Sequence, residues 1–373
     1  MWLKAVDTAV PGDSARNISS DAQWWSDLSA KLDRAEIPAL NGIRAVAVWL
    51  VVTFHFGETV NGALGVEMFF TLSGFLITLL LLREHEVTGT VSLKNFYVRR
   101  TRRIFPALYV FVAFGVLLYL VRGHEVPWRD VIASLLYVEN YYEGIAHTKD
   151  TFVGHTWSLG IEEQFYLLWP LLMLRLRHDL RKLMFALASV IALSWMLRIV
   201  MQYGIQAYPG YIYHAFETRM DQLAIGCLLA VLMKRYRLGG RWRQFLMHPL
   251  SPGAIIACIA ASSLFHGHVH YRYPFAYTIE PVLTALLILL LIAQSEHPVW
   301  RQFNHPVMRF IGRISYSVYL YQQLTLWTAR RFTESFPLVV QYVFAWGVTL
   351  VFALLSYYLV EQRLRAPRKE APA

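Results

Sequence analysis

The sequence is poor in charged residues and rich in apolar ones. Only 16% of its 373 residues are charged, whereas 56% are hydrophobic, and the mean hydropathy is +0.38. Ordinary soluble domains contain about 25% charged residues and alternate apolar with polar segments. This composition excludes that class and indicates a polytopic membrane protein built only from helices.

Cysteine and metal-ligating clusters are also scarce. The only two cysteines, Cys227 and Cys258, lie inside apolar runs without metal-type spacing, so they are expected to be packed thiols. His266, His268 and His270 alternate in a short segment without supporting cysteines or carboxylates, which favours a solvated loop. We therefore expect no metal.

The net charge of +10 does not indicate nucleic acid. Binding to nucleic acid requires Lys and Arg to gather on one surface, but here they punctuate the apolar runs. No nucleic-acid partner is expected.

The N-terminal segment lacks the basic, apolar and small-residue series of a cleaved signal peptide. Residues 1–36 are expected to form a cytoplasmic extension, which could lie on the membrane through Trp24 and Trp25. Residues 37–366 form one membrane domain without internal repeats, and residues 367–373 a short cytoplasmic tail.

Ten apolar windows are long enough to be membrane-crossing helices. After a first span within 41–61, they lie near 64–82, 104–121, 158–174, 183–201, 216–233, 252–265, 278–293, 307–328 and 337–359. With both termini in the cytoplasm, 27 of the 35 Lys and Arg residues fall on the inner side. The positive-inside rule therefore favours this orientation. The outer segment 122–155 contains VIASLLYVENYY, which is too short to span and could be a lid or an interfacial helix.

The first span carries ionisable residues that are costly inside a bilayer unless they serve a site. Arg44 and His55 are 11 positions apart, which turns through three full turns plus about 20°, so both project from one helix face. Glu58 falls near that face. A neutral histidine can accept a hydroxyl proton, so His55 is a candidate general base or nucleophile activator, although a hydrogen bond to a neighbouring helix is about equally compatible.

A second cluster, FYVRRTRRIFPAL at 96–108, contains Arg99, Arg100 and Arg103 and is expected to place Pro106 in the first turn of the third span. Arginine binds phosphate in bidentate fashion, and a helix N-terminus adds partial positive charge. Taken alone, such a cluster usually only anchors the topology.

Two further polar segments lie at the start of later spans. In HTWSLGIEEQFYLLWP at 155–170, Glu162 and Glu163 point about 100° apart, so at most one faces the first span, where His55 or Arg44 could balance its charge. In FETRMDQLAIG at 216–226, Arg219 and Asp221 lie on different faces, and a structural role is the leading interpretation, ahead of substrate contact.

Together these motifs, in this order, resemble the membrane acyltransferase 3 family from Ile37 onward. The resemblance rests on the Arg44–His55 spacing and the 96–108 and 155–167 motifs. It also rests on GVEMFFTLSGFL at 65–76, RMDQLAIG at 219–226, IGRISYSVYLYQ at 311–322 and the closing VEQRLRAP.

The resemblance implies a ten-span bundle in a bacterial inner membrane that transfers an acetyl group from acetyl-CoA to a carbohydrate hydroxyl. Arg44 and His55 match the family's essential pair, and Arg100 and Arg103 match arginines linked to the acyl-CoA. With these, the expected catalytic residues include Glu162 and Glu163, the expected CoA contacts include Arg99, and the expected acceptor contacts are His155, Trp157, Arg219 and Asp221.

Two departures from the family pattern qualify this expectation. Where many members have an aromatic residue followed by His, this chain reads Tyr321-Gln322, so no role of that His carries over. The chain also ends shortly after the tenth span, so the hydrolase-like domain fused to some members is expected to be absent, and a partner enzyme, or none, would take over its work.

A proton-coupled transporter of a glycan or lipid-linked precursor is the alternative from another class, with Arg44, His55 and the glutamates as a proton relay. The sequence leaves open the acceptor glycan, the length of the acyl group, direct transfer against an acyl-enzyme, and the oligomeric state.

Overall fold

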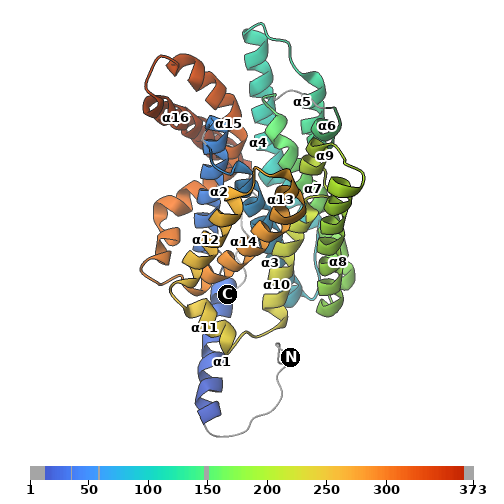
Figure 1. The fold of residues 1–373 in the computed structure, drawn as a ribbon, viewed down its shortest axis with the longest axis vertical. Coiled ribbons are helices and arrows are strands. Elements are labelled where there is room, and N and C mark those ends of the chain that lie inside the picture. The colour runs from blue at the N-terminus through green and yellow to red at the C-terminus, as the bar shows by residue number, and fades with distance from the viewer. Residues whose placement is uncertain (1–12, 35, 58, 147–150, 365–373) are drawn as a thin grey trace.

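The computed structural model describes residues 13–34, 36–57, 59–146 and 151–364, and the described residues contain helices but no strands. Helices occupy all ten positions predicted for spans (Figure 1). They are α2 (Pro38–Phe56), α3 (Gly62–Thr88), α4 (Leu93–Val121), α7 (Trp157–Leu176), α8 (Leu180–Ile199), α10 (Met220–Arg235), α12 (Ser251–Leu264), α14 (Tyr277–Ala293), α15 (Pro306–Thr333) and α16 (Leu338–Ser356).

The remaining helices lie in the connections or at the two ends of the described chain. They are α1 (Asp13–Leu32), α5 (Trp128–Leu135), α6 (Glu139–Ala146), α9 (Pro209–His214), α11 (Arg241–Met247), α13 (Val269–Tyr271) and α17 (Gln362–Leu364). Short 3₁₀ or π segments are η1 (Gly154–Thr156), η2 (Val200–Gly204), η3 (Arg272–Ala276), η4 (Trp300–Asn304) and η5 (Tyr357–Glu361). The apolar piece of the outer segment forms α5 and the start of α6. Glu58 and the predicted tail lie outside the described residues.

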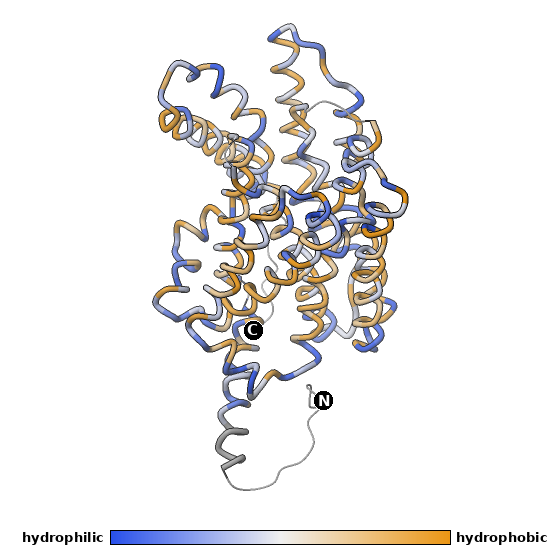
Figure 2. The backbone as a smooth tube through the Cα atoms, viewed as in Figure 1, coloured by the Kyte–Doolittle hydropathy of each residue, from blue (hydrophilic) through white to orange (hydrophobic). Residues whose placement is uncertain are grey.

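Among the described residues, six helical segments are long and apolar enough to cross a membrane, and there are seven if α11 and α12, bent by 79°, count as one. Figure 2 shows that apolar residues predominate through the body of the bundle and that polar residues are concentrated in the connections. The predicted spans at α7, α10 and α15 do not pass this test. Helix α10 has only 16 residues, whereas α7 and α15 carry polar residues that face the bundle, such as the half-buried Glu162 and the buried Gln322. The structure is that of a multi-pass membrane protein.

Local sequence signals place the ends of the helices around the candidate site. Pro38 stands in the first turn of α2, and Gly57 ends the helix with φ of 103°, a left-handed conformation that favours glycine. The Asn61 side chain caps α3 by accepting from the Leu64 amide at 3.1 Å.

The start of α4 differs from the prediction. The Ser92 side chain caps α4 by accepting from the Asn95 amide, so the helix begins at Leu93 and Pro106 lies inside it, not in its first turn. The arginine cluster is therefore one to three turns inside a helix, and the proposed help from a helix N-terminus is wrong. Helical phase decides which arginines face the bundle.

The centre of the bundle is formed by α2, α3, α10, α14 and α15, with α3 packed between α2 and α10. The α3–α10 crossing depends on small residues, because a Cβ atom added to Gly226 would lie 2.0 Å from the Thr71 carbonyl oxygen. Close backbone approach through glycine is a usual way of packing helices in membranes. This close contact fixes which face of α3 packs against α10 and which face is left for the candidate site described below.

Replacing Gly226 by alanine should lower the unfolding temperature of the purified protein, because backbone atoms of α3 must move to admit the methyl group. Overpacking of this kind costs about 1–3 kcal/mol. Gly347→Ala on α16 is the matched control, since its added Cβ meets no atom within 4 Å. Thermal unfolding in detergent compares the two, and equal unfolding temperatures would contradict the packing argument.

Candidate functional site

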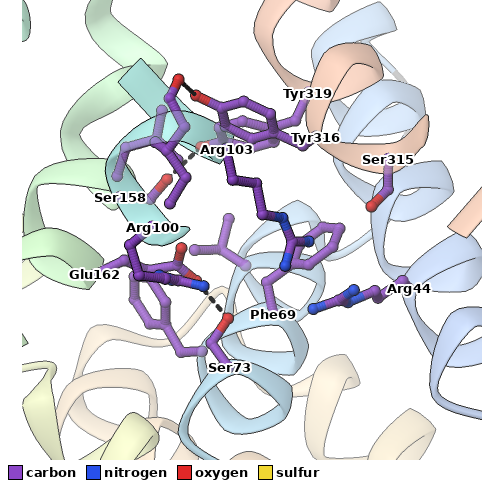
Figure 3. A pocket seen from close by; sticks show the side chains of 14 residues that line it. Arg44, Phe69, Ser73, Arg100, Arg103, Ser158, Glu162, Ser315, Tyr316 and Tyr319 are labelled. Atoms are coloured by element: carbon purple, nitrogen blue, oxygen red, sulfur yellow. Dashed lines mark hydrogen bonds between the residues drawn. The ribbon is translucent and has the colours of Figure 1, made fainter. Parts of the chain in front are cut away.

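A cavity of about 70 Å³ lies among α2, α3, α4, α7 and α15, and we call it the central cavity (Figure 3). Arginines, one carboxylate, hydroxyl groups and aromatic rings line it. Its polar and aromatic lining residues are Arg44, Phe69, Phe70, Ser73, Arg100, Arg103, Ser158, Glu162, Ser315, Tyr316 and Tyr319. Residues from five helices that are distant in sequence therefore meet around one space.

A second space of about 340 Å³, which we call the basal cavity, adjoins the first. The two share Arg44, Ser73, Arg100 and Arg103 in their linings. The basal cavity adds Arg34, Arg83 and Arg99 and has one lining carboxylate, Glu36. The pair of cavities thus forms a basic basin that narrows into an aromatic end.

Arg44 is positioned by the first turns of α2 and lines both cavities, as the interpretation of the first span required. Figure 3 shows the guanidinium groups of Arg44 and Arg103 pointing into the same space from different helices. Both are partly buried. An anion in this space would meet two planar cations, which bind phosphate or carboxylate through paired hydrogen bonds.

The phase of α4 separates its four arginines. Arg100 and Arg103, one turn apart, line both cavities, and the Arg100 guanidinium lies 3.6 Å above the Tyr166 ring centroid. Arg99 lies at the rim of the basal cavity, where its exposed side chain pairs with Glu84 at 3.0 Å. Arg102 is exposed and lines neither cavity.

The two adjacent glutamates take different environments, as the 100° offset predicted. Glu162 lines the central cavity and accepts a hydrogen bond from the Ser73 hydroxyl at 2.8 Å. It also interacts electrostatically with Arg100, Arg44 and Arg103. The predicted balance between Glu162 and Arg44 is therefore present, whereas its role in orienting His55 stays a prediction.

Glu163 lies behind this wall and lines neither cavity. Its Oε1 atom is buried without a hydrogen-bond partner among the described residues, and Arg100 is the cation with which it interacts most strongly. The structure therefore separates the two glutamates: Glu162 faces the cavity, and Glu163 packs behind it.

His55 lies in the last turn of α2, half-buried, and is not a lining residue of the central cavity. Its Nδ1 atom is 2.9 Å from the Val51 carbonyl oxygen, which can only accept, so Nδ1 donates and the neutral ring carries its lone pair on Nε2. This is the tautomer that a base acting through Nε2 needs.

One layer of side chains separates His55 from the aromatic end of the central cavity. Tyr319 lines the cavity and donates to the His155 carbonyl oxygen at 2.7 Å, while its hydroxyl lies 2.6 Å from that of Ser158. His155 in turn interacts electrostatically with His55. Burial, followed by the nearby charge of His55, lowers the pKa of His155 to about 3, so His155 is neutral.

The residues predicted as acceptor contacts do not line either cavity. His155 is buried in the layer just described, and the Trp157 ring lies edge-on to Phe70 at 6.3 Å between centroids. Arg219 is fully buried, 3.7 Å from Glu67 and 3.8 Å above the Tyr277 ring. Contact with an acceptor stays a prediction for all of them.

Asp221 supports the structural interpretation of its motif. Both oxygens of the Asp221 carboxylate accept hydrogen bonds from Arg198, at 2.8 and 2.7 Å, and both side chains are fully buried. Arg219 and Asp221 lie on different faces, as their spacing predicted, and each belongs to a separate ion pair.

The expectation of a solvated histidine loop is wrong for His266. Its side chain is buried and lies 3.7 Å from Glu280, whereas His268 is exposed. No group of three or more potential ligands arranged for a metal occurs in the part of the chain that the structure describes.

Sequence reasoning missed several lining residues. Ser73, Tyr316 and Tyr319 lie within motifs that carry the family resemblance, but serines and tyrosines on apolar helices have no spacing signal of their own. Arg83 has no sequence signal for a site, and the structure places it in the wall of the basal cavity.

Comparisons with known proteins identify related sequences. A family model described as an acyltransferase domain matches residues 37–358. A Staphylococcus aureus (strain COL) protein named "Putative O-acetyltransferase" is 31% identical over 358 residues, which are 88% of this chain and 57% of that protein. The Listeria monocytogenes protein named peptidoglycan O-acetyltransferase OatA is 32% identical over 359 residues, 90% of this chain and 57% of its own length. The chain thus spans a little over half the length of these relatives, and no solved structure matches it.

Proposed function

Because this chain belongs to the acyltransferase 3 family, whose domain covers residues 37–358, we propose that it is a membrane O-acetyltransferase that moves an acetyl group from acetyl-CoA to a carbohydrate hydroxyl. The proposal includes ten membrane-crossing helices in a bacterial inner membrane, with both termini in the cytoplasm. The basin of arginines then opens to the cytoplasm, where acyl-CoA is found.

The observation that carries the proposal is the shape and charge of the two joined cavities. Arg44, Arg100 and Arg103 surround the point where the wide basal cavity meets the central one. CoA has phosphates at one end and a thioester at the end of a pantetheine arm of about 15–20 Å. Phosphates among the arginines would let that arm run through the central cavity toward Tyr319.

The chemistry requires one bond to form and one to break. The acceptor oxygen attacks the thioester carbon, the C–O bond forms, the C–S bond breaks, and CoA leaves as a thiolate. In our proposal Nε2 of His55 takes the proton from the hydroxyl and later returns it to the sulfur. In this scheme the donor approaches the layer of Tyr319, Ser158 and His155 from the central cavity and the acceptor hydroxyl approaches it from the side of His55, so the layer must open for the two to meet.

The class of acceptor follows from the relatives' names. The Listeria monocytogenes relative is named for peptidoglycan, as is a Bacillus subtilis relative that is 32% identical over 357 residues. We propose cell-wall glycan as the first acceptor to test, with other surface polysaccharides and lipo-oligosaccharides next. A separate enzyme that assembles or delivers the glycan is a possible partner in this scheme.

Transfer of label tests the function directly. The protein in vesicles, given acetyl-CoA labelled in its acetyl group and soluble glycan fragments, should move the label to sugar. Mass spectrometry of cell-wall and secreted glycans with and without the protein should show one acetyl increment. No transfer to any glycan, together with glycan uptake driven by a pH gradient without acyl-CoA, would instead support a proton-coupled transporter.

Neutralising one glutamate at a time should separate their roles. We expect Glu162→Gln to lower kcat about 10- to 100-fold, because it removes the carboxylate that holds three arginines and Ser73 in place. Glu163→Gln makes the same charge change one residue away but outside the cavities, and should lower kcat less than about threefold. Steady-state kinetics with acetyl-CoA compares them. Equal losses would show that Glu162 has no special position.

A further inference from the structure

The arginines of the basal cavity fall into two groups. Arg44, Arg100 and Arg103 lie at the junction with the central cavity, whereas Arg34, Arg83 and Arg99 line the basal cavity and not the central one. We call the second group the mouth cluster. Ser73 at the junction and Arg83 in the mouth cluster are ten residues apart on α3, which is about 15 Å of helical rise.

Within the mouth cluster, Arg83 is the side chain whose surroundings are incomplete. It is 19% exposed, its Nη1 donates to the Arg34 carbonyl oxygen at 3.2 Å, and its Nε lies 3.5 Å from the Asp33 carboxylate. Its Nη2 atom is buried and has no hydrogen-bond partner among the described residues. A buried guanidinium without full pairing is costly, so this atom indicates a ligand.

The nearby carboxylates do not complete it. Asp33 also pairs with Lys234 at 3.2 Å, so its charge is shared between two cations. Glu84 pairs with Arg99 at 3.0 Å. Glu86, which also interacts electrostatically with Arg83, pairs with Lys234 at 2.9 Å. Each of these three carboxylates therefore also pairs with another cation, and Nη2 of Arg83 has no carboxylate of its own among the described residues.

We propose that the mouth cluster is a second phosphate site, in which Arg83 binds the 3′-phosphate on the ribose of acetyl-CoA while the junction arginines bind the pyrophosphate. This inference rests on the proposed function and adds the group by which the enzyme distinguishes CoA from its dephosphorylated form. A phosphomonoester carries close to two charges and three acceptor oxygens, which suits a guanidinium with a donor to spare. The phosphate of an anionic lipid headgroup offers the same chemistry from another source.

A comparison of two donors tests the site on the full-length protein in vesicles of neutral lipid. Acetyl-CoA and acetyl-3′-dephospho-CoA are compared with the wild type, Arg83→Gln, Arg83→Lys and the control Arg102→Gln, whose side chain is exposed on α4. We expect the wild type to have about a 10-fold higher KM for the dephospho donor, because a charged hydrogen bond is lost. Arg83→Gln should raise the KM for acetyl-CoA by a similar factor and leave kcat and the KM for the dephospho donor nearly unchanged. The KM of Arg83→Lys for acetyl-CoA should lie between those of the wild type and Arg83→Gln.

Each other outcome overturns the inference in a distinct way. If Arg83→Gln raises KM equally for both donors, Arg83 does not contact the 3′-phosphate. If its defect appears only in vesicles that contain anionic lipid, the site binds a headgroup. Direct binding keeps this separate from the proposed function: tighter binding of CoA than of dephospho-CoA, lost in Arg83→Gln, supports the site even if no acetyl transfer occurs. Equal binding of both by the wild type overturns it.

Discussion

Replacing His55 by alanine should lower acetyl transfer by about 10²- to 10⁴-fold, the usual loss when a general base is removed. The KM for acetyl-CoA should change little, because His55 lies beyond the layer of Tyr319 and His155 and does not line the cavities. Initial rates with labelled acetyl-CoA, at matched levels of purified protein, measure both quantities.

His268→Ala is the matched control for His55→Ala. It removes an exposed imidazole from the connection between α12 and α13 and should leave kcat and KM unchanged. Transfer retained in His55→Ala would remove His55 from the mechanism. The base would then have to be found among groups that face the central cavity, of which Glu162 is the one carboxylate.

The second large effect is expected from the two arginines of α4 that face the basin. The double variant Arg100→Gln/Arg103→Gln should raise the KM for acetyl-CoA by more than about 100-fold, because each lost charged contact to phosphate costs roughly 1.5–3 kcal/mol. The kcat at saturating donor should fall much less, since neither residue is close to His55 in our scheme. A full titration of donor concentration separates the two effects.

Arg102→Gln provides the control on the same helix. It makes the same charge change next to Arg103 in sequence but on the exposed side of α4, so it should leave the KM unchanged. An equal rise in KM for Arg102→Gln and for single Arg103→Gln would mean that net charge near the membrane surface matters, and that the cavity does not bind the donor.

The helical phase of α4 illustrates how far the sequence reaches. The spacing of Arg99, Arg100, Arg102 and Arg103 fixes that two of them share a face, but not which face turns inward. The misplaced start of the third span came from the same limit: hydropathy marks the apolar part of α4, whereas its first turns are polar and begin at the Ser92 cap. The Ser92 cap sets the first residue of α4, and therefore how many turns separate the arginines from the start of the helix.

His55 shows the reverse case. The spacing of 11 residues predicted that it lies on the same face of α2 as Arg44, and α2 is a continuous helix over both. Residues of η1 and α15 lie between His55 and the cavity that Arg44 lines. They follow His55 by more than 90 residues in the sequence. No pattern within the first span could reveal Tyr319 or His155.

The sequence by itself determined the class of protein, the ten helices and the two helices that carry the main cationic groups. Hydropathy, capping and the 3.6-residue period act over short distances along the chain, so they can be read without a fold. Only the tertiary structure decided that Glu162 and not Glu163 enters the central cavity, that Arg83 belongs to a ligand-sized space, and that Asp221 is used up in pairing with Arg198. These outcomes depend on how helices rotate against one another. That rotation depends on close helix contacts at glycines, such as Gly226 of α10 against Thr71 of α3. It therefore depends on residues that are far apart in the chain.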